Sequence, residues 1–170
     1  PRCFKGDIRK IYAQGEVFLE VAHDKKHPFI VESDDFKLQV LGTKFNISNY
    51  KGGTTNIVLV EGAVEVTDKN EKKARLNPND LLNIANGTIA YQKQVDVAEY
   101  ISWVEGIMLL NGNDLSQIIQ RLSIYYGISI QCDPIIGKEK VYGKLDLKDD
   151  IDEVIECIQQ TLPFTIEKRD

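Results

Sequence analysis

The sequence predicts an all-β domain followed by a small α+β domain. Residues 4–97 read as many short strands separated by turns, without a helical period. After residue 99 the period becomes helical, and a β-α-β unit occurs twice at a spacing of 36 residues. We therefore expect an all-β sandwich, roll or solenoid over residues 1–98 and an α+β domain with a βαββαβ repeat over residues 99–170.

Length and charge limit the function further. The 170 residues suffice for one full domain or two small ones, and 42% apolar with 28% charged residues is ordinary for a folded chain. The 26 acidic residues outnumber the 21 basic ones, and the net charge of −5 argues against nucleic acid or an anionic membrane as a partner. Because the chain begins with proline and lacks an apolar run of about 20 residues, we expect it to be an excised part of a longer protein.

Short apolar stretches bounded by turns predict the strands of the first domain. They cover residues 17–22, 29–31, 37–41, 44–47, 56–60, 63–67, 80–84 and 88–92. The segments between them are rich in Gly, Pro, Asn and Asp, which favour turns, as in 24–28, 51–53 and 86–87. Regular strands and turns of this kind are typical of an all-β domain.

Two amphipathic segments predict the helices of the second domain. Each begins with an Asp that is followed three residues later by Gln or Glu, a capping box in which the Asp side chain accepts an amide hydrogen bond. These pairs are Asp114 with Gln117 and Asp150 with Glu153. The apolar faces have the spacing of a helix that packs on a sheet: Leu115, Ile118, Ile119, Leu122 and Tyr126, and then Ile151, Val154, Ile155, Ile158 and Leu162.

A strand is expected before and after each of these helices. The preceding strands cover residues 106–110 and 141–147, and the following strands cover residues 128–130 and 164–166. The two β-α-β units would share one sheet that both helices cover on one face, with right-handed crossovers for any parallel pair.

Five strings of the first domain, in this order and spacing, resemble the extracytoplasmic domain of FecR-type anti-sigma factors. They are GEVFLEVAHD (15–24), HPFIVES (27–33), LGTKFNI (41–47), LVEGAVEV (59–66) and LNPND (76–80). Residues 99–131 are similar to the small domain that closes such proteins in Bacteroidetes, which is related in design to the signalling domains of secretins and TonB-dependent transporters. Together the two resemblances cover nearly the whole chain.

The resemblance implies a sensor in the periplasm of a Gram-negative cell, anchored in the inner membrane by a segment upstream of this chain. Its partner would be the N-terminal signalling domain of a ligand-loaded, TonB-dependent (SusC- or FecA-like) outer-membrane transporter. Its output would be the release of an extracytoplasmic-function sigma factor. The sequence holds neither the cytoplasmic sigma-binding helices nor a transmembrane segment, so we expect this part alone not to bind the sigma factor.

No residue pattern indicates catalysis, a cofactor or a metal site. His23 and His27 have the i, i+4 spacing of zinc ligands on a helix, but they flank two lysines and precede Pro28, where a helix is disfavoured. The carboxylates within residues 146–153 lack the central glycine of a calcium loop and have a lysine at a ligand position. Helix capping explains these carboxylates better, and we expect no enzyme activity.

The remaining reactive or flexible residues have structural explanations. Cys3, Cys132 and Cys157 form no C-x-x-C pair, and small apolar filling is favoured over a disulfide between the last two. Gly52 and Gly53 lack the strand-loop-helix context of a phosphate loop, so they predict the tip of a hairpin.

Two surfaces are candidates for partner binding. Trp103, at the junction of the two domains, either anchors a partner or fills the hydrophobic hinge between the domains. The strand at 141–147 alternates apolar residues with exposed polar ones, so one face can pack while its backbone pairs with a partner strand. We therefore single out Trp103, Tyr142, Lys144 and Leu145 as partner-binding residues.

The alternative function belongs to another class, a non-enzymatic structural or carbohydrate-binding β module of the cell envelope. The α+β unit would then serve as an assembly domain. A hydrophobic span upstream of the chain, together with neighbouring genes for a sigma factor and a TonB-dependent transporter, would favour the anti-sigma factor.

Overall fold

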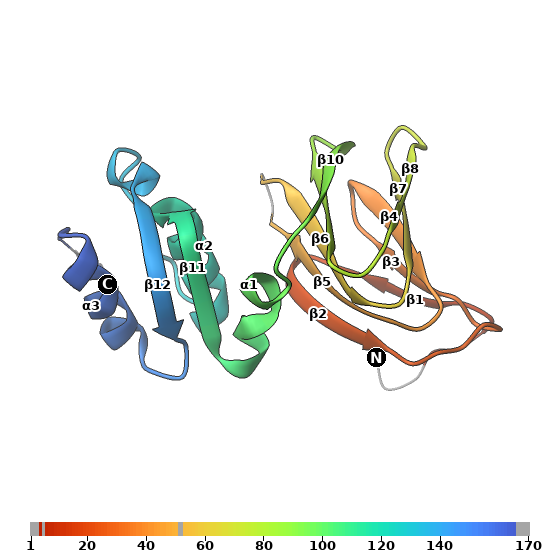
Figure 1. The fold of residues 1–170 in the computed structure, drawn as a ribbon, viewed down its shortest axis with the longest axis horizontal. Helices are drawn as coiled ribbons and strands as arrows, with labels where there is room; N and C mark the ends of the chain where they lie inside the picture. The colour runs from red at the N-terminus through yellow and green to blue at the C-terminus, as the bar shows by residue number, and fades with distance from the viewer. Residues whose placement is uncertain (1–3, 5, 51–52, 166–170) are drawn as a thin grey trace. The chain divides into compact units, whose positions relative to one another are not determined.

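A computed structural model describes residue 4, residues 6–50 and residues 53–165. The chain divides into two compact units, residues 1–100 and residues 101–170. Strands β1 to β10 lie in the first unit, whereas the second combines two strands with helices (Figure 1). The predicted fold class, all-β followed by a small α+β part, is confirmed.

The first unit is a sandwich of two five-stranded sheets. The first sheet has the order β1 (Arg9–Tyr12), β3 (Phe29–Glu32), β4 (Phe36–Val40), β7 (Val64–Asp68), β8 (Lys73–Leu76). The second has the order β10 (Thr88–Gln94), β9 (Asp80–Ala85), β6 (Thr55–Glu61), β5 (Thr43–Asn49), β2 (Gly15–Val21). Neighbouring strands are antiparallel except β1 and β3, which are parallel.

Side-chain alternation along the strands builds the core between the two sheets. On β4, Phe36, Leu38 and Val40 are buried, whereas Lys37 and Gln39 are exposed on the outer face. The same alternation on the other strands completes one apolar cluster, to which β3, β5, β6, β7 and β9 contribute Phe29, Val31, Phe45, Ile47, Ile57, Leu59, Val64, Val66, Leu82 and Ile84.

Two strands of the first unit were not predicted from the sequence. Strand β1 has a single inward apolar residue, Ile11, and it pairs with β3 in a parallel register that joins Arg9 to Phe29. Strand β8 presents Ala74 and Leu76 inward within an otherwise charged segment. Both are short edge strands, which neighbouring strands rather than local pattern define. Of the turn predicted at 51–53, residues 51 and 52 lie outside the described part of the chain.

The second unit packs two helices on one face of a two-stranded sheet. Two short helices, α1 (Ala98–Ile101) and the 3-10 helix η1 (Ser102–Glu105), lead into it. The remaining elements are β11 (Ile107–Asp114), α2 (Leu115–Tyr126), the 3-10 helix η2 (Ile136–Lys138), β12 (Lys140–Asp146) and α3 (Ile151–Thr161). Strands β11 and β12 are antiparallel, and their buried residues join those of α2 and α3 in a second apolar cluster.

The strand predicted at 128–130 does not form. Gly127 ends α2 in the left-handed conformation that glycine adopts without strain, with φ of 67°. The backbone N–H of Ile128 then donates to the Ser123 carbonyl (2.9 Å), and that of Ile130 donates to Ser123 Oγ (3.2 Å). Because these amides are bound to the end of α2, they are not available to a strand partner.

The strand predicted at 164–166 is also not found where the chain is described. Residues 164 and 165 have no regular secondary structure, and the Gln159 side chain donates to the Phe164 carbonyl (2.7 Å). Residue 166 lies outside the described part of the chain. The described sheet of the second unit therefore contains one antiparallel pair and no parallel crossover.

The two capping boxes have different outcomes. At α3, Asp150 Oδ1 accepts from the Glu153 backbone N–H (3.0 Å), which confirms the predicted cap. At α2, the Asp114 side chain makes no capping hydrogen bond, so that prediction is wrong. Its Oδ1 pairs instead with Lys140 Nζ across the sheet at 2.8 Å, because Asp114 is opposite Lys140 in the β11–β12 register.

Asp68, at the end of β7, connects both sheets of the first unit. It is buried, and its Oδ1 accepts from the backbone N–H groups of Asn70 (2.8 Å) and Lys72 (3.0 Å). Its Oδ2 accepts from the backbone N–H of Ile89 (3.0 Å), on β10 of the other sheet. These backbone donors, that of Ile89 foremost, lower the pKa of the Asp68 carboxyl because they stabilise its charged form.

We predict that Asp150→Ala destabilises the protein by about 1 kcal/mol, because a lost N-cap leaves a helix amide unsatisfied. Asp114→Ala is the matched control and should cost less than about 0.5 kcal/mol, since it removes only a partly exposed ion pair. Urea unfolding of both variants measures the difference. Equal losses of unfolding free energy in the two variants would contradict the conclusion that Asp150 caps its helix and Asp114 does not.

We predict that Asp68→Asn lowers the thermal unfolding midpoint by about 4–8 °C at pH 7, because the neutral amide binds the three backbone donors less strongly. A lowered pKa contributes stability above the ordinary carboxyl pKa, and this stability is lost as pH falls through the folded value. The gap between wild type and variant should therefore close as pH falls below about 4. A gap that is unchanged at low pH in thermal melts would contradict this role.

Candidate partner-binding surface

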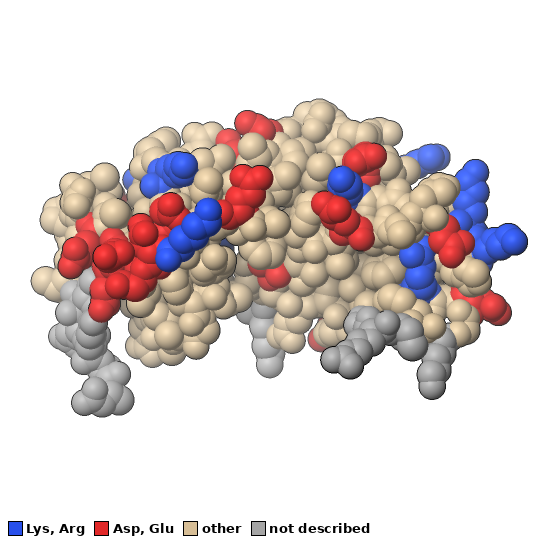
Figure 2. All heavy atoms as spheres, turned by 90° about the horizontal axis from the view of Figure 1, so that it is seen from below, with Lys and Arg blue, Asp and Glu red and all other residues tan. Residues whose placement is uncertain are grey.

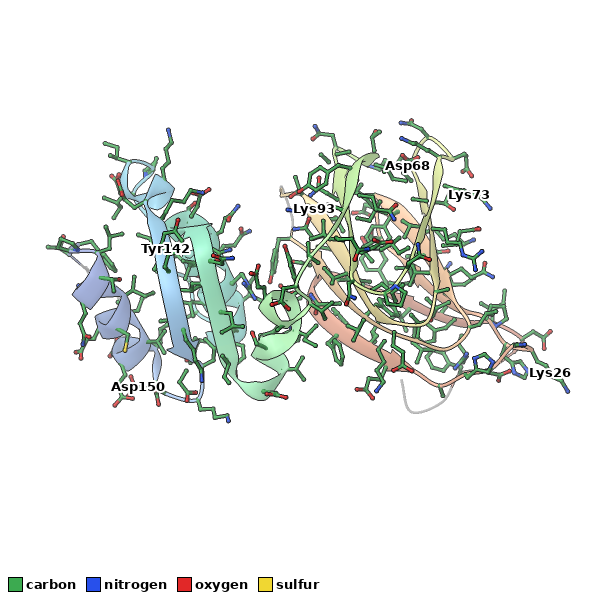
Figure 3. The ribbon with its side chains drawn as sticks, viewed as in Figure 1. Lys26, Asp68, Lys73, Lys93, Tyr142 and Asp150 are labelled. Carbon is green, nitrogen blue, oxygen red and sulfur yellow. The ribbon has the colours of Figure 1, made fainter. Side chains whose placement is uncertain are left out.

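The outer face of β12 carries two of the residues singled out from the sequence. Val141 and Leu145 are buried against the helices, whereas Tyr142 and Lys144 are exposed, Tyr142 to 66%. Figure 3 shows Tyr142 projecting from β12. The structure thus brings Tyr142 and Lys144 to one face of one strand. Leu145 is only 5% exposed, so it belongs to the core and offers a partner no more than its backbone.

The Tyr142 ring is held in place although it is exposed. It lies against Gly112 of the neighbouring strand, where a Cβ atom would be 3.0 Å from Tyr142 Oη and 3.3 Å from its Cε1. Gly112 has φ of 74° and sits where the β11–β12 register shifts between Asn111 and Asn113. The glycine at this bulge therefore leaves the space over which the ring lies, and this contact is the seat of Tyr142.

Sequence reasoning missed Gly112. A glycine inside a strand pattern often marks a bulge, so the run Asn111-Gly112-Asn113 was an available signal. Which side chain would fill the space above the glycine depends on the strand register, and that register is a property of the folded sheet.

Strand β12 also has an edge that can accept another strand. Among the described residues it pairs with β11 on one side only. Unpaired strand edges bind extended segments through main-chain hydrogen bonds, and side chains beside the edge give specificity. Lys144 beside this edge also discourages pairing between identical copies, because like charges repel.

Trp103, the other candidate, has a packing role. It lies in η1, is partly buried and packs against the apolar cluster of the second unit. The arrangement supports its role as a hydrophobic filler at the start of this unit. It does not place Trp103 on the exposed face of β12.

Charge is distributed unevenly between the two units. Residues 1–100 contain 14 basic and 14 acidic residues, whereas residues 101–170 contain 7 basic and 12 acidic residues, so the second unit holds the whole net charge. Figure 2 shows acidic side chains gathered over α3 and the segment before it. They include Asp146, Asp149, Asp150, Asp152, Glu153 and Glu156. Such a field speeds the approach of a partner with a basic surface.

The histidine and acidic residues considered as metal ligands in the sequence have other contacts among the described residues. His27 Nδ1 lies 2.7 Å from Asp24 Oδ2, and this contact orders the turn before β3 and lowers the pKa of the Asp24 carboxyl. No group of three or more His, Cys, Asp or Glu side chains in the described residues is arranged to hold a metal ion. Cys132 and Cys157 are free thiols, and burial raises the pKa of Cys132; Cys3 lies outside the described residues.

None of the described helices is long and apolar enough to span a membrane.

Comparison with known proteins relates both units to one family. Residues 5–65 match the family described as FecR protein, and residues 107–170 match the family described as FecR, C-terminal. A proposed anti-sigma factor of Parabacteroides distasonis ATCC 8503 has a similar crystal structure, determined at 1.65 Å and at 2.50 Å resolution. Both crystal structures give a TM-score of 0.82 and 30% sequence identity. The match covers 100% of this chain, and it covers 81% of the chain in the first crystal structure and 80% of the chain in the second. No curated protein matches the sequence.

We predict that Gly112→Ala destabilises the protein by about 1–2 kcal/mol, the cost of a left-handed non-glycine residue, and displaces the Tyr142 ring. Gly127→Ala is the matched control, because its φ is 67° but no atom lies within 4 Å of the new Cβ. It should destabilise the protein similarly and leave Tyr142 in place. Tyr142 ring resonances in NMR spectra measure the displacement, and resonances unchanged in Gly112→Ala would contradict the seat.

Proposed function

The chain belongs to the FecR family, and on this premise we propose that it is the periplasmic sensor part of a membrane-anchored anti-sigma factor that binds the N-terminal signalling domain of a TonB-dependent outer-membrane transporter. The family is regulatory rather than enzymatic, and its anti-sigma role implies interaction with a sigma factor. In this proposal the sigma factor is bound by the cytoplasmic part of the protein, and the second unit receives the transporter.

The edge of β12 that pairs with no other described strand is the observation that carries the proposal. A strand of the signalling domain adds to this edge, and its backbone amides and carbonyls pair with those of β12. Tyr142 and Lys144 then contact the side chains of the added strand on the open face of the sheet. The Tyr142 ring loses little freedom on binding, because Gly112 already restrains it.

Electrostatics supports the same surface. The acidic side chains around α3 attract a partner with a basic face and orient it during approach. Lys144 is a cation on β12, two residues from Asp146 on the same strand face, and it favours an acidic or polar neighbour on the added strand. Charge therefore selects among partners, whereas the main-chain pairing supplies sequence-independent affinity.

The output of such a module is a shift in conformational populations. No covalent bond is made or broken by this chain in the proposed function. A partner alters the signal only to the extent that it binds one arrangement of the sensor more tightly than another.

We predict that Tyr142→Ala and Lys144→Glu each weaken binding to the purified N-terminal signalling domain of a TonB-dependent outer-membrane transporter by about tenfold or more. Tyr125→Ala is the matched control, since Tyr125 is 42% exposed on α2, away from β12. Isothermal titration calorimetry measures the affinities. Unchanged binding by both β12 variants, with weaker binding by the control, would refute the edge as the binding surface.

A further inference from the structure

A groove of about 420 Å³ lies on the outer face of the first sheet, far from β12 in the sequence. Its floor is formed by outward side chains of β4 and β7, and its walls by the β3–β4 turn and the β7–β8 turn. The volume falls within the range of small-molecule sites. The groove lies in the first unit, which also contains the FecR match at residues 5–65. The function proposed for β12 does not use this groove.

Strand register arranges the floor of this groove in rows. Lys37 of β4 is opposite Thr67 of β7, and Thr67 is opposite Lys73 of β8. In the next row, Gln39 is opposite Glu65. Adjacent strands are about 4.8 Å apart, so each row offers hydrogen-bonding groups at a regular interval. Ammonium, hydroxyl, amide and carboxylate groups are mixed in this array rather than forming blocks of one kind.

Side-chain contacts link the two turns that border the groove and cross its floor. Lys69 Nζ pairs with Asp35 Oδ1 at 2.7 Å, which ties the β7–β8 turn to the β3–β4 turn. Ser33 Oγ accepts from the backbone N–H groups of Asp35 (3.1 Å) and Phe36 (3.2 Å). Lys73 Nζ pairs with Glu65 Oε1 at 2.9 Å across the floor. Figure 3 labels Asp68 and Lys73, two residues of the groove, in the first unit.

An exposed aromatic ring lies beside the groove. Tyr12 of β1 is opposite Glu32 of β3, a residue of the groove wall, and it is 58% exposed. The nearby carboxylate of Asp34, which also lines the groove, raises the pKa of the Tyr12 hydroxyl. An exposed ring provides a flat apolar platform next to a polar floor.

The lining excludes several ligand classes. It contains six carboxylates and three lysines, so a polyphosphate or nucleic acid would be repelled. Phe36, its one apolar side chain, is buried at 4% exposure, so an apolar ligand finds no matching surface. The backbones of β4 and β7 are paired on both sides, so an extended peptide cannot add as a strand.

We infer that this groove binds a neutral oligosaccharide. Sugar hydroxyls both donate to carboxylates and accept from ammonium and amide groups, which matches the mixed floor of Lys37, Gln39 and Glu65. The apolar face of a sugar ring would stack on Tyr12. The groove recognises its ligand by side chains alone, whereas β12 offers a free backbone edge, so the two sites are independent.

The test is a printed array of neutral oligosaccharides, including chitotetraose, maltotetraose and cellotetraose, probed with the labelled full chain. Calorimetry then measures the affinity for the strongest hit. Lys37→Ala/Gln39→Ala should weaken this affinity by about tenfold or more. The matched control, Lys93→Ala/Gln120→Ala, changes the same residue types at exposed positions outside the groove and should bind as wild type.

Four further measurements make the result decisive. Thermal melts within a few degrees of wild type show that the variants fold, and Thr67→Ala provides a second groove variant with a smaller change. Tyr142→Ala should keep full oligosaccharide binding, and the groove variants should keep full binding to the transporter's signalling domain. The inference is overturned if no neutral oligosaccharide binds the wild-type chain more tightly than it binds Lys37→Ala/Gln39→Ala. It is also overturned if a basic peptide displaces the bound oligosaccharide and binds more tightly than the oligosaccharide does.

Discussion

Alternation of side chains along a strand is the constraint on which the first unit depends. Every second residue of each strand enters the space between the two sheets, so Phe36, Leu38 and Val40 of β4 must be apolar while Lys37 and Gln39 must face water. The residues between those that enter the core point to the outer face of the sheet. Because register aligns neighbouring strands, the outward residues form rows, and the rows form the floor of the polar groove.

The second unit meets a different constraint, the marginal stability of a two-stranded sheet in water. Packing α2 and α3 on one face buries Met108 and Leu110 of β11 with Val141 and Leu145 of β12. This leaves the other face and the outer edge of β12 without a described partner. One aromatic residue, Tyr142, is nevertheless fixed there by Gly112. Stabilising one face by helices therefore creates the open surface that recognition uses.

The two candidate surfaces recognise ligands by different chemistry. Strand β12 offers main-chain groups, which pair with any extended segment and need side chains such as Lys144 for selectivity. The backbones of β4 and β7 under the groove are paired on both sides, so its side chains carry both affinity and selectivity. Net charge follows the same division, since the first unit is balanced and the second is acidic. A sensor built this way can receive a protein and a small polar molecule at separate places.

Local sequence determined the strands with clear alternation, the two amphipathic helices, the Gly127 helix end and the Asp150 cap, because each depends on residues a few positions apart. It also indicated that Tyr142 and Lys144 face outward. Tertiary structure decided what depends on register and distant contacts: the parallel pairing of β1, the Lys140 contact that takes Asp114 from its cap, and the seat of Tyr142 on Gly112. The groove belongs to this second group, because no short segment contains residues of β4 and β7 together.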